Sequence, residues 1–140
     1  MEILLVDDNL GDVSLAREAL NGTSPPTHLN VVSDGEEAML FLRREGPYGA
    51  APSPDVVVLA LNLPGMGGCE VLREIRAEAQ FRSLPVTVLT SSEASQDVLR
   101  AYHLRANCYI VKPTDRQDYI SAIRQIHAFW GCVAILPPRN

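Results

Sequence analysis

Lysine is almost absent from this sequence: the chain has 12 basic residues, and Lys112 is the only lysine among them. The net charge is -5, and no run of Lys or Arg forms the basic patch expected of a nucleic-acid-binding surface. No apolar stretch approaches the roughly 20 residues of a membrane span. The N-terminus has no basic segment ahead of its short apolar run, so it does not predict a signal peptide. We therefore expect a cytoplasmic protein that binds neither nucleic acid nor membrane.

Cysteine is also scarce, with Cys69, Cys108 and Cys132 spread along the chain. They show neither a CxxC motif nor the spacing of metal ligands. Partly buried free thiols in a reducing compartment are the ordinary interpretation. The lone Lys112 is more informative. It indicates a site that needs a compact ammonium on a flexible stem rather than the planar guanidinium of arginine.

The rest of the composition is that of one globular domain, with 140 residues of which 46% are hydrophobic. Short apolar runs, several of them rich in β-branched residues, predict buried strands. These runs cover residues 3–6, 29–32, 56–59, 85–90 and 109–111. Between and after them, apolar residues recur at helical spacing, which predicts five helices. Five strands alternating with five helices predict an α/β protein with a doubly wound parallel sheet.

Polar residues stand at the ends of several predicted strands. Asp7 and Asp8 follow the first run, Thr90 ends the fourth, and Lys112 follows the fifth. In an open parallel sheet, a site forms outside the carboxyl ends of the strands. Acids, a hydroxyl and an ammonium at that edge predict a convergent polar site. The third run ends instead at Ala60, where the pattern makes a carboxylate the expected residue.

Four motifs carry a resemblance to a known family: Leu5-Val6-Asp7-Asp8-Asn9, the segment from Pro54 to Gly68, Leu89-Thr90-Ser91, and Tyr109-Ile110-Val111-Lys112-Pro113. Together they resemble the response-regulator receiver domain of two-component signalling over nearly the whole chain. The resemblance implies a flavodoxin-like sheet of order 2-1-3-4-5 with five helices. The segment 129–138 further resembles the stand-alone regulators that partner phytochrome-type histidine kinases.

The resemblance implies a metal site at Asp7 and Asp8, the acidic pair that holds Mg²⁺. The backbone carbonyl of Asn62 would supply a further oxygen, and ligation by oxygen alone suits this hard cation. It also implies a phosphate site, in which Thr90 follows the phosphoryl group and Lys112 pairs with it. Tyr109 matches the aromatic residue that changes rotamer on activation.

Ala60 occupies the position of the phospho-accepting aspartate. Phosphoryl transfer from a phosphohistidine needs an in-line nucleophile, and a methyl group cannot attack phosphorus. We therefore predict that this chain is not phosphorylated there, and that Mg²⁺ binding is weakened by the lost carboxylate. An engineered or recent inactivation competes with a native pseudo-receiver that binds its partner without phosphorylation. The otherwise complete site favours the former.

We expect no enzymatic activity, since a phosphohydrolase or flavin protein on this fold would need an aspartyl nucleophile or a flavin phosphate loop. The expected partner is a sensor histidine kinase, with no DNA-binding domain attached. We assign residues 1–128 to the receiver domain and 129–140 to a C-terminal extension. The apolar side chains of that extension either pack back on their own domain or, with the last helix, form a homodimer contact.

Overall fold

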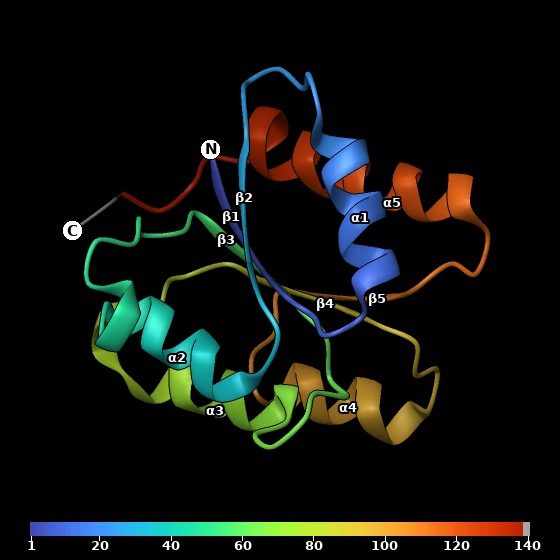
Figure 1. The fold of residues 1–140 in the computed structure, drawn as a ribbon. Helices are drawn as coiled ribbons and strands as arrows, with labels where there is room; N and C mark the ends of the chain where they lie inside the picture. The colour runs from blue at the N-terminus through green and yellow to red at the C-terminus, as the bar shows by residue number, and fades with distance from the viewer. Residues whose placement is uncertain (139–140) are drawn as a thin grey trace.

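A five-stranded parallel sheet of order β2-β1-β3-β4-β5 forms the centre of the computed structural model, which describes residues 1–138 (Figure 1). The strands are β1 Glu2–Val6, β2 His28–Val32, β3 Val56–Leu59, β4 Val86–Thr90 and β5 Cys108–Val111. The helices are α1 Leu10–Leu20, α2 Gly35–Arg43, α3 Gly68–Ala77, α4 Ser95–His103 and α5 Arg116–Ala128. Short helical turns cover Gly46–Tyr48, Ala79–Phe81 and Phe129–Val133. The predicted flavodoxin-like topology is confirmed.

The helices cover both faces of the sheet. Helices α1 and α5 pack on one face, and α2, α3 and α4 pack on the other (Figure 1). All four residues of β3 are buried, as expected of a central strand between two helical layers. Each face has its own apolar cluster, so the sheet is sandwiched between two cores. Within residues 1–138, no helix is both long enough and apolar enough to cross a membrane.

Three helices begin at a residue whose side chain caps the first turn. Asn9, Asp34 and Asp115 each accept a hydrogen bond from the backbone N–H three residues later. Such a cap satisfies one of the free N–H groups of the first turn. The cap at Asn9 starts α1 directly after the acidic pair, which fixes where the first turn of α1 stands relative to the end of β1.

The start of α3 packs closely against the residue that follows β3. A Cβ added at Gly68 would lie 2.2 Å from the Ala60 carbonyl oxygen and 2.7 Å from the Leu61 Cα. Both neighbours are main-chain atoms, so only glycine fits without a backbone shift. Gly68 therefore holds the segment after β3 in place at the carboxyl edge of the sheet.

Candidate functional site

The carboxyl edge of the sheet brings the predicted site residues together. Asp7 follows β1, Ala60 follows β3, Thr90 ends β4 and Lys112 follows β5. Lys112 Nζ lies 2.8 Å from Asp7 Oδ2, across a separation of more than one hundred residues in the chain. The convergence predicted from the strand ends is therefore present for this pair.

Asp7 is the buried acid of the site, with a side chain only 2% exposed. Its Oδ1 accepts a hydrogen bond from the Asn9 N–H at 3.0 Å. Its Oδ2 is close to Lys112 but has no aligned hydrogen bond, so the contact is an ion pair without directed geometry. A buried carboxylate oxygen with spare lone pairs is a fit ligand for a hard cation. Asp8, next in the chain, is exposed to solvent.

Asp12 is a partner of Lys112 that the sequence reasoning missed. Lys112 Nζ donates a hydrogen bond of 2.8 Å to Asp12 Oδ2, and the Asp12 side chain is 22% exposed. The signal for it was present, because the cap at Asn9 places Asp12 in the first turn of α1. Burial by itself lowers the pKa of Lys112, but the contacts with Asp12 and Asp7 outweigh it, so the pKa lies above its ordinary value.

Ala60 is 4% exposed and is held by a backbone hydrogen bond of 3.0 Å to the Val6 carbonyl. The next N–H, that of Leu61, donates to Thr90 Oγ1 at 3.4 Å. Thr90 thus lies beside the position that Ala60 fills with a methyl group. Among the described residues, none donates a hydrogen bond to the Asn62 carbonyl. The oxygen that the family resemblance assigns to a metal therefore has no competing partner.

Tyr109 lies on β5 and is tied to the α4 side of the molecule. Its hydroxyl donates to the Ser92 carbonyl at 2.9 Å, and its N–H donates to the Tyr102 hydroxyl at 3.2 Å. Burial raises the pKa of the Tyr109 phenol above its ordinary value, although the bond to Ser92 acts in the opposite direction. The ring is therefore anchored two residues beyond Thr90 on the loop that leads into α4.

The residues at this edge fit a divalent cation. Asp7, Asp8 and the Asn62 carbonyl offer oxygen ligands, and the buried Asp7 Oδ2 has no aligned donor of its own. Over residues 1–138, no group of three or more His, Cys, Asp and Glu side chains is arranged to hold a metal. A cation here would therefore depend on the main-chain oxygen as well as on the two carboxylates.

The C-terminal segment is partly packed on the domain and partly exposed. Trp130 belongs to the apolar cluster under α1 and α5, and its indole N–H donates to Thr87 Oγ1 at 3.2 Å. Val133 and Ile135, in contrast, are 72% and 97% exposed. Of the two predicted alternatives, packing on the domain is thus seen for Trp130, while the homodimer contact stays a prediction.

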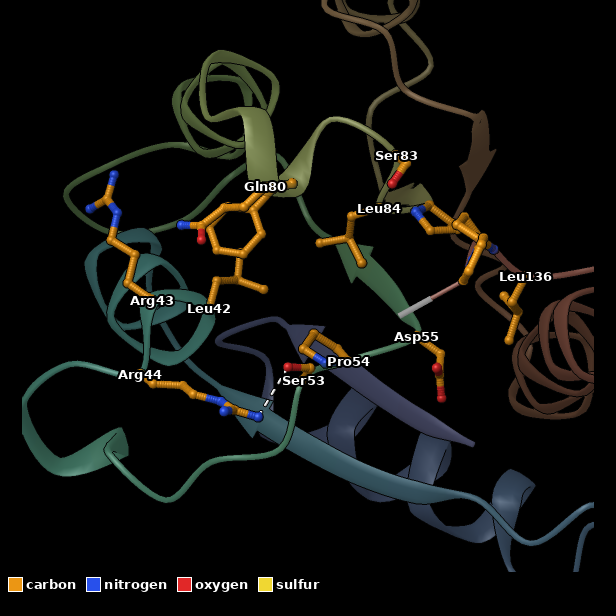
Figure 2. A pocket seen from close by; sticks show the side chains of 14 residues that line it. Leu42, Arg43, Arg44, Ser53, Pro54, Asp55, Gln80, Ser83, Leu84 and Leu136 are labelled. Carbon is orange, nitrogen blue, oxygen red and sulfur yellow. Dashed lines mark hydrogen bonds between the residues drawn. The ribbon is translucent and has the colours of Figure 1, made fainter. Parts of the chain in front are cut away.

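The last described residues line a cleft of about 470 Å³ at the amino end of the strands. Leu136 lies at one side of this cleft, while Arg43 and Arg44 lie at the other (Figure 2). Arg44 reaches Ser53 with a hydrogen bond of 3.1 Å. The cleft is remote from the predicted site and contains none of its residues.

Comparison with known proteins gives this architecture a family. Residues 3–124 match the model of the response regulator receiver domain. The chain is 38% identical over 135 residues to response regulator Rcp1 of Synechocystis sp., covering 96% of this chain and 92% of the relative. The crystal structure of the phosphorylated cyanobacterial phytochrome response regulator RcpA has a TM-score of 0.95 and 40% identity, with 98% of each chain covered.

A second solved structure is the Mn²⁺-bound form of response regulator Rcp1. It has a TM-score of 0.93 and 37% identity, and the match covers 98% of this chain and 99% of that one. The resemblance to stand-alone phytochrome response regulators is therefore confirmed over nearly the full length. The chain belongs to the response regulator receiver domain family.

Proposed function

We propose that this chain is a single-domain response regulator of a phytochrome-type sensor histidine kinase that does not accept a phosphoryl group at the usual position. The observation that carries the proposal is Ala60, which lies directly after β3, beside Thr90 and at the edge that holds Lys112. Its relatives support the signalling context, since they include response regulators of phytochromes. Like receiver domains in general, the chain would act by protein contact rather than by enzymatic turnover.

The chemistry of the site supports the loss of phosphotransfer. The cationic and hydroxyl groups that follow a phosphoryl group are present in Lys112 and Thr90, but the nucleophile is not. Incubation of this chain with acetyl phosphate and Mg²⁺, followed by intact-mass measurement, is expected to give no adduct. An added phosphoryl mass on the unmodified chain would refute the proposal.

We propose that Asp7, Asp8 and the Asn62 carbonyl hold Mg²⁺, with affinity reduced by the missing carboxylate of position 60. When bound, the cation would neutralise charge on phosphoryl oxygens. Calorimetric titration of this chain beside Ala60→Asp is expected to show weaker binding by about tenfold in this chain. Equal Mg²⁺ affinities would contradict the role of Ala60 in the metal site.

A phosphorylation-independent binding module is the second candidate function. The observation that favours it is the pair of carboxylates, Asp7 and Asp12, already holding Lys112. Because Lys112 is already paired with two carboxylates, its charge is balanced without a phosphoryl group. Binding of a phytochrome-type kinase to this chain as tightly as to a phosphorylated Ala60→Asp variant would support the module. Binding only to the phosphorylated variant would favour the regulator.

We propose that the chain forms a homodimer through α5 and the C-terminal extension. Support comes from Val133 and Ile135, whose exposure would be costly on a monomer. Sedimentation of the double variant Val133→Glu, Ile135→Glu is expected to show a monomer. Leu10→Glu is the matched control, because Leu10 is an equally exposed apolar residue outside the extension. If the double variant Val133→Glu, Ile135→Glu is still a dimer, the extension is excluded as the contact.

The proposed boundary between receiver and extension lies at Ala128, where α5 ends. The extension, residues 129–140, reaches Asn140, and its last two residues lie outside the described part of the chain. A partner of the histidine kinase class supports a cytoplasmic location for the protein.

A further inference from the structure

An open cleft at the amino ends of β4 and β5 is lined by Arg76, Arg82, Arg105 and Asn107. Arg76 is partly buried, and its guanidinium donates to main-chain carbonyls on both sides of the cleft. It reaches the Leu84 carbonyl at 2.8 Å and the Arg105 carbonyl at 2.9 Å. Because these acceptors are neutral, the charge of Arg76 is not cancelled by a carboxylate in the described part of the chain.

The orientation of the Asn107 amide follows from its own hydrogen bonds. Its Oδ1 accepts from Arg76 Nη2 at 3.0 Å and from the Val86 N–H at 2.8 Å. Two donors at one atom identify that atom as the oxygen, which leaves the Nδ2 group as a donor. Within residues 1–138, Nδ2 donates to no acceptor. The Asn107 side chain therefore adds a free donor to the cleft.

Arg82 and Arg105 are exposed, and neither forms an ion pair with a described residue. This differs from Arg43, which is paired with Glu74 and Glu78 elsewhere on the surface. Arg82, Arg105 and Asn107 thus offer hydrogen-bond donors to the cleft, and three of the four lining side chains carry positive charge. Burial lowers the pKa of Arg76, and the charge of Arg105 lowers it further. An anion in the cleft would relieve this repulsion.

Arg105 also has a backbone conformation that disfavours its residue type. Its φ is 69°, in the left-handed region where glycine is preferred. The angle belongs to the end of α4, where the Arg105 N–H donates to the Tyr102 carbonyl at 2.9 Å and the Ala106 N–H donates to the Ala101 carbonyl at 3.0 Å. The Arg105 carbonyl, held by Arg76, keeps this conformation in place.

We propose that the cleft lined by Arg76, Arg82, Arg105 and Asn107 binds a compact oxyanion with two or more negative charges. Arg82, Arg105 and the Asn107 Nδ2 group donate to its oxygens, and Arg76 supplies fixed positive charge from behind. Arginine forks match the geometry of phosphate and sulfate oxygens. This site is at the opposite edge of the sheet from Lys112 and is independent of the phosphoryl chemistry proposed above.

Inorganic phosphate is the probe for this site. We expect a titration of the isotope-labelled full chain, at constant ionic strength, to give saturable amide shifts at Asn107 and Arg105. Arg105→Gly is expected to weaken the affinity by about tenfold, since a charged hydrogen-bonding group is lost. Arg44→Gly is the matched control, because Arg44 also has a left-handed φ, of 56°, but lies outside the cleft. It should keep the wild-type affinity.

Glycerol 3-phosphate is titrated alongside free phosphate. If it binds as tightly as free phosphate, the cleft is assigned to a phosphate carried on a larger molecule. If it does not bind, the cleft is assigned to the free ion. Shifts centred on Thr90 and Lys112 instead of Asn107 would place phosphate at the other edge and overturn the proposal. Equal phosphate affinity in Arg105→Gly and Arg44→Gly would overturn it as well.

Discussion

Lys112 and Arg76 are two partly buried cations at opposite edges of the same sheet, and they are held in different ways. Lys112 lies between two carboxylates, Asp7 and Asp12, and its pKa is raised in spite of burial. Arg76 is surrounded by neutral carbonyl and amide oxygens, and burial together with Arg105 lowers its pKa. Similar burial therefore gives opposite shifts, because the charge of the partners differs.

The two cations therefore differ in role: Lys112 lies in a candidate binding site, whereas Arg76 links two loops. At the carboxyl edge, Lys112 is bound by groups that a metal ion or a phosphoryl group would compete for. At the amino edge, Arg76 donates hydrogen bonds to the Leu84 and Arg105 carbonyls and so joins the loops before β4 and β5.

Lys112→Met is expected to have the largest effect on stability. The substitution leaves the buried Asp7 carboxylate without its cation, so the free energy of unfolding in EDTA should fall by about 3 kcal/mol. Urea unfolding measures the change. Arg116→Met is the matched control, because Arg116 and its partner Glu18 are 56% and 49% exposed and such pairs contribute about 0–1 kcal/mol. Equal losses in the two variants would show that the carboxyl edge holds no special ion pair.

The same variant gives a pH signature. The pKa of Lys112 is raised in the folded chain, so its stabilising contribution is complete below the unfolded value, about 10.4, and is lost as pH rises through the folded pKa. The stability difference between the wild type and Lys112→Met should therefore be constant from neutral pH upward and shrink only above about pH 10.4. A difference that shrinks below pH 9 or so would contradict a raised pKa.

Arg76→Met is expected to have the second-largest effect, about 2 kcal/mol, from the loss of its hydrogen bonds to carbonyls. Because the partners are neutral, no carboxylate is left unpaired by the change. Thermal unfolding measures the loss, and Arg73→Met, on the exposed side of the same helix, provides the control. A loss as small as that of Arg73→Met would mean that Arg76 does not join the two loops.

Ala60→Asp is expected to have the smallest effect. Without metal, a further carboxylate near Asp7 and Asp8 adds like-charge repulsion, so the variant should be less stable than this chain by about 1 kcal/mol. Unfolding in urea at low ionic strength, with EDTA present, tests this. A higher urea midpoint for Ala60→Asp would show that attraction to Lys112 outweighs repulsion from Asp7 and Asp8.

Much of the fold could be predicted from the sequence, because β1, β3 and β4 are short, mostly buried apolar runs. The buried β3 run is a local feature that its composition predicts, and Asn9, Asp34 and Asp115 are of residue types that favour helix N-caps. The convergence of Asp7 and Lys112 followed from topology, since parallel strands share a carboxyl edge.

Other features depend on side-chain reach, which periodicity does not contain. Asp12 was not among the predicted site residues, and its bond to Lys112 depends on how the first turn of α1 faces β5. The sequence also did not predict that Trp130 packs on the domain while Ile135 is exposed. The cation-lined cleft at Arg105 depends on a left-handed backbone angle that no sequence motif announces.

The most direct test of the account is whether one carboxylate restores phosphotransfer. This chain, Ala60→Asp and the double variant Ala60→Asp, Lys112→Met are incubated with acetyl phosphate and Mg²⁺, and the intact masses are compared. The account predicts a single phosphoryl adduct on Ala60→Asp, a strongly reduced adduct on the double variant and none on this chain. An adduct on this chain, or its absence from Ala60→Asp, would contradict the claim that the site is complete except for its nucleophile.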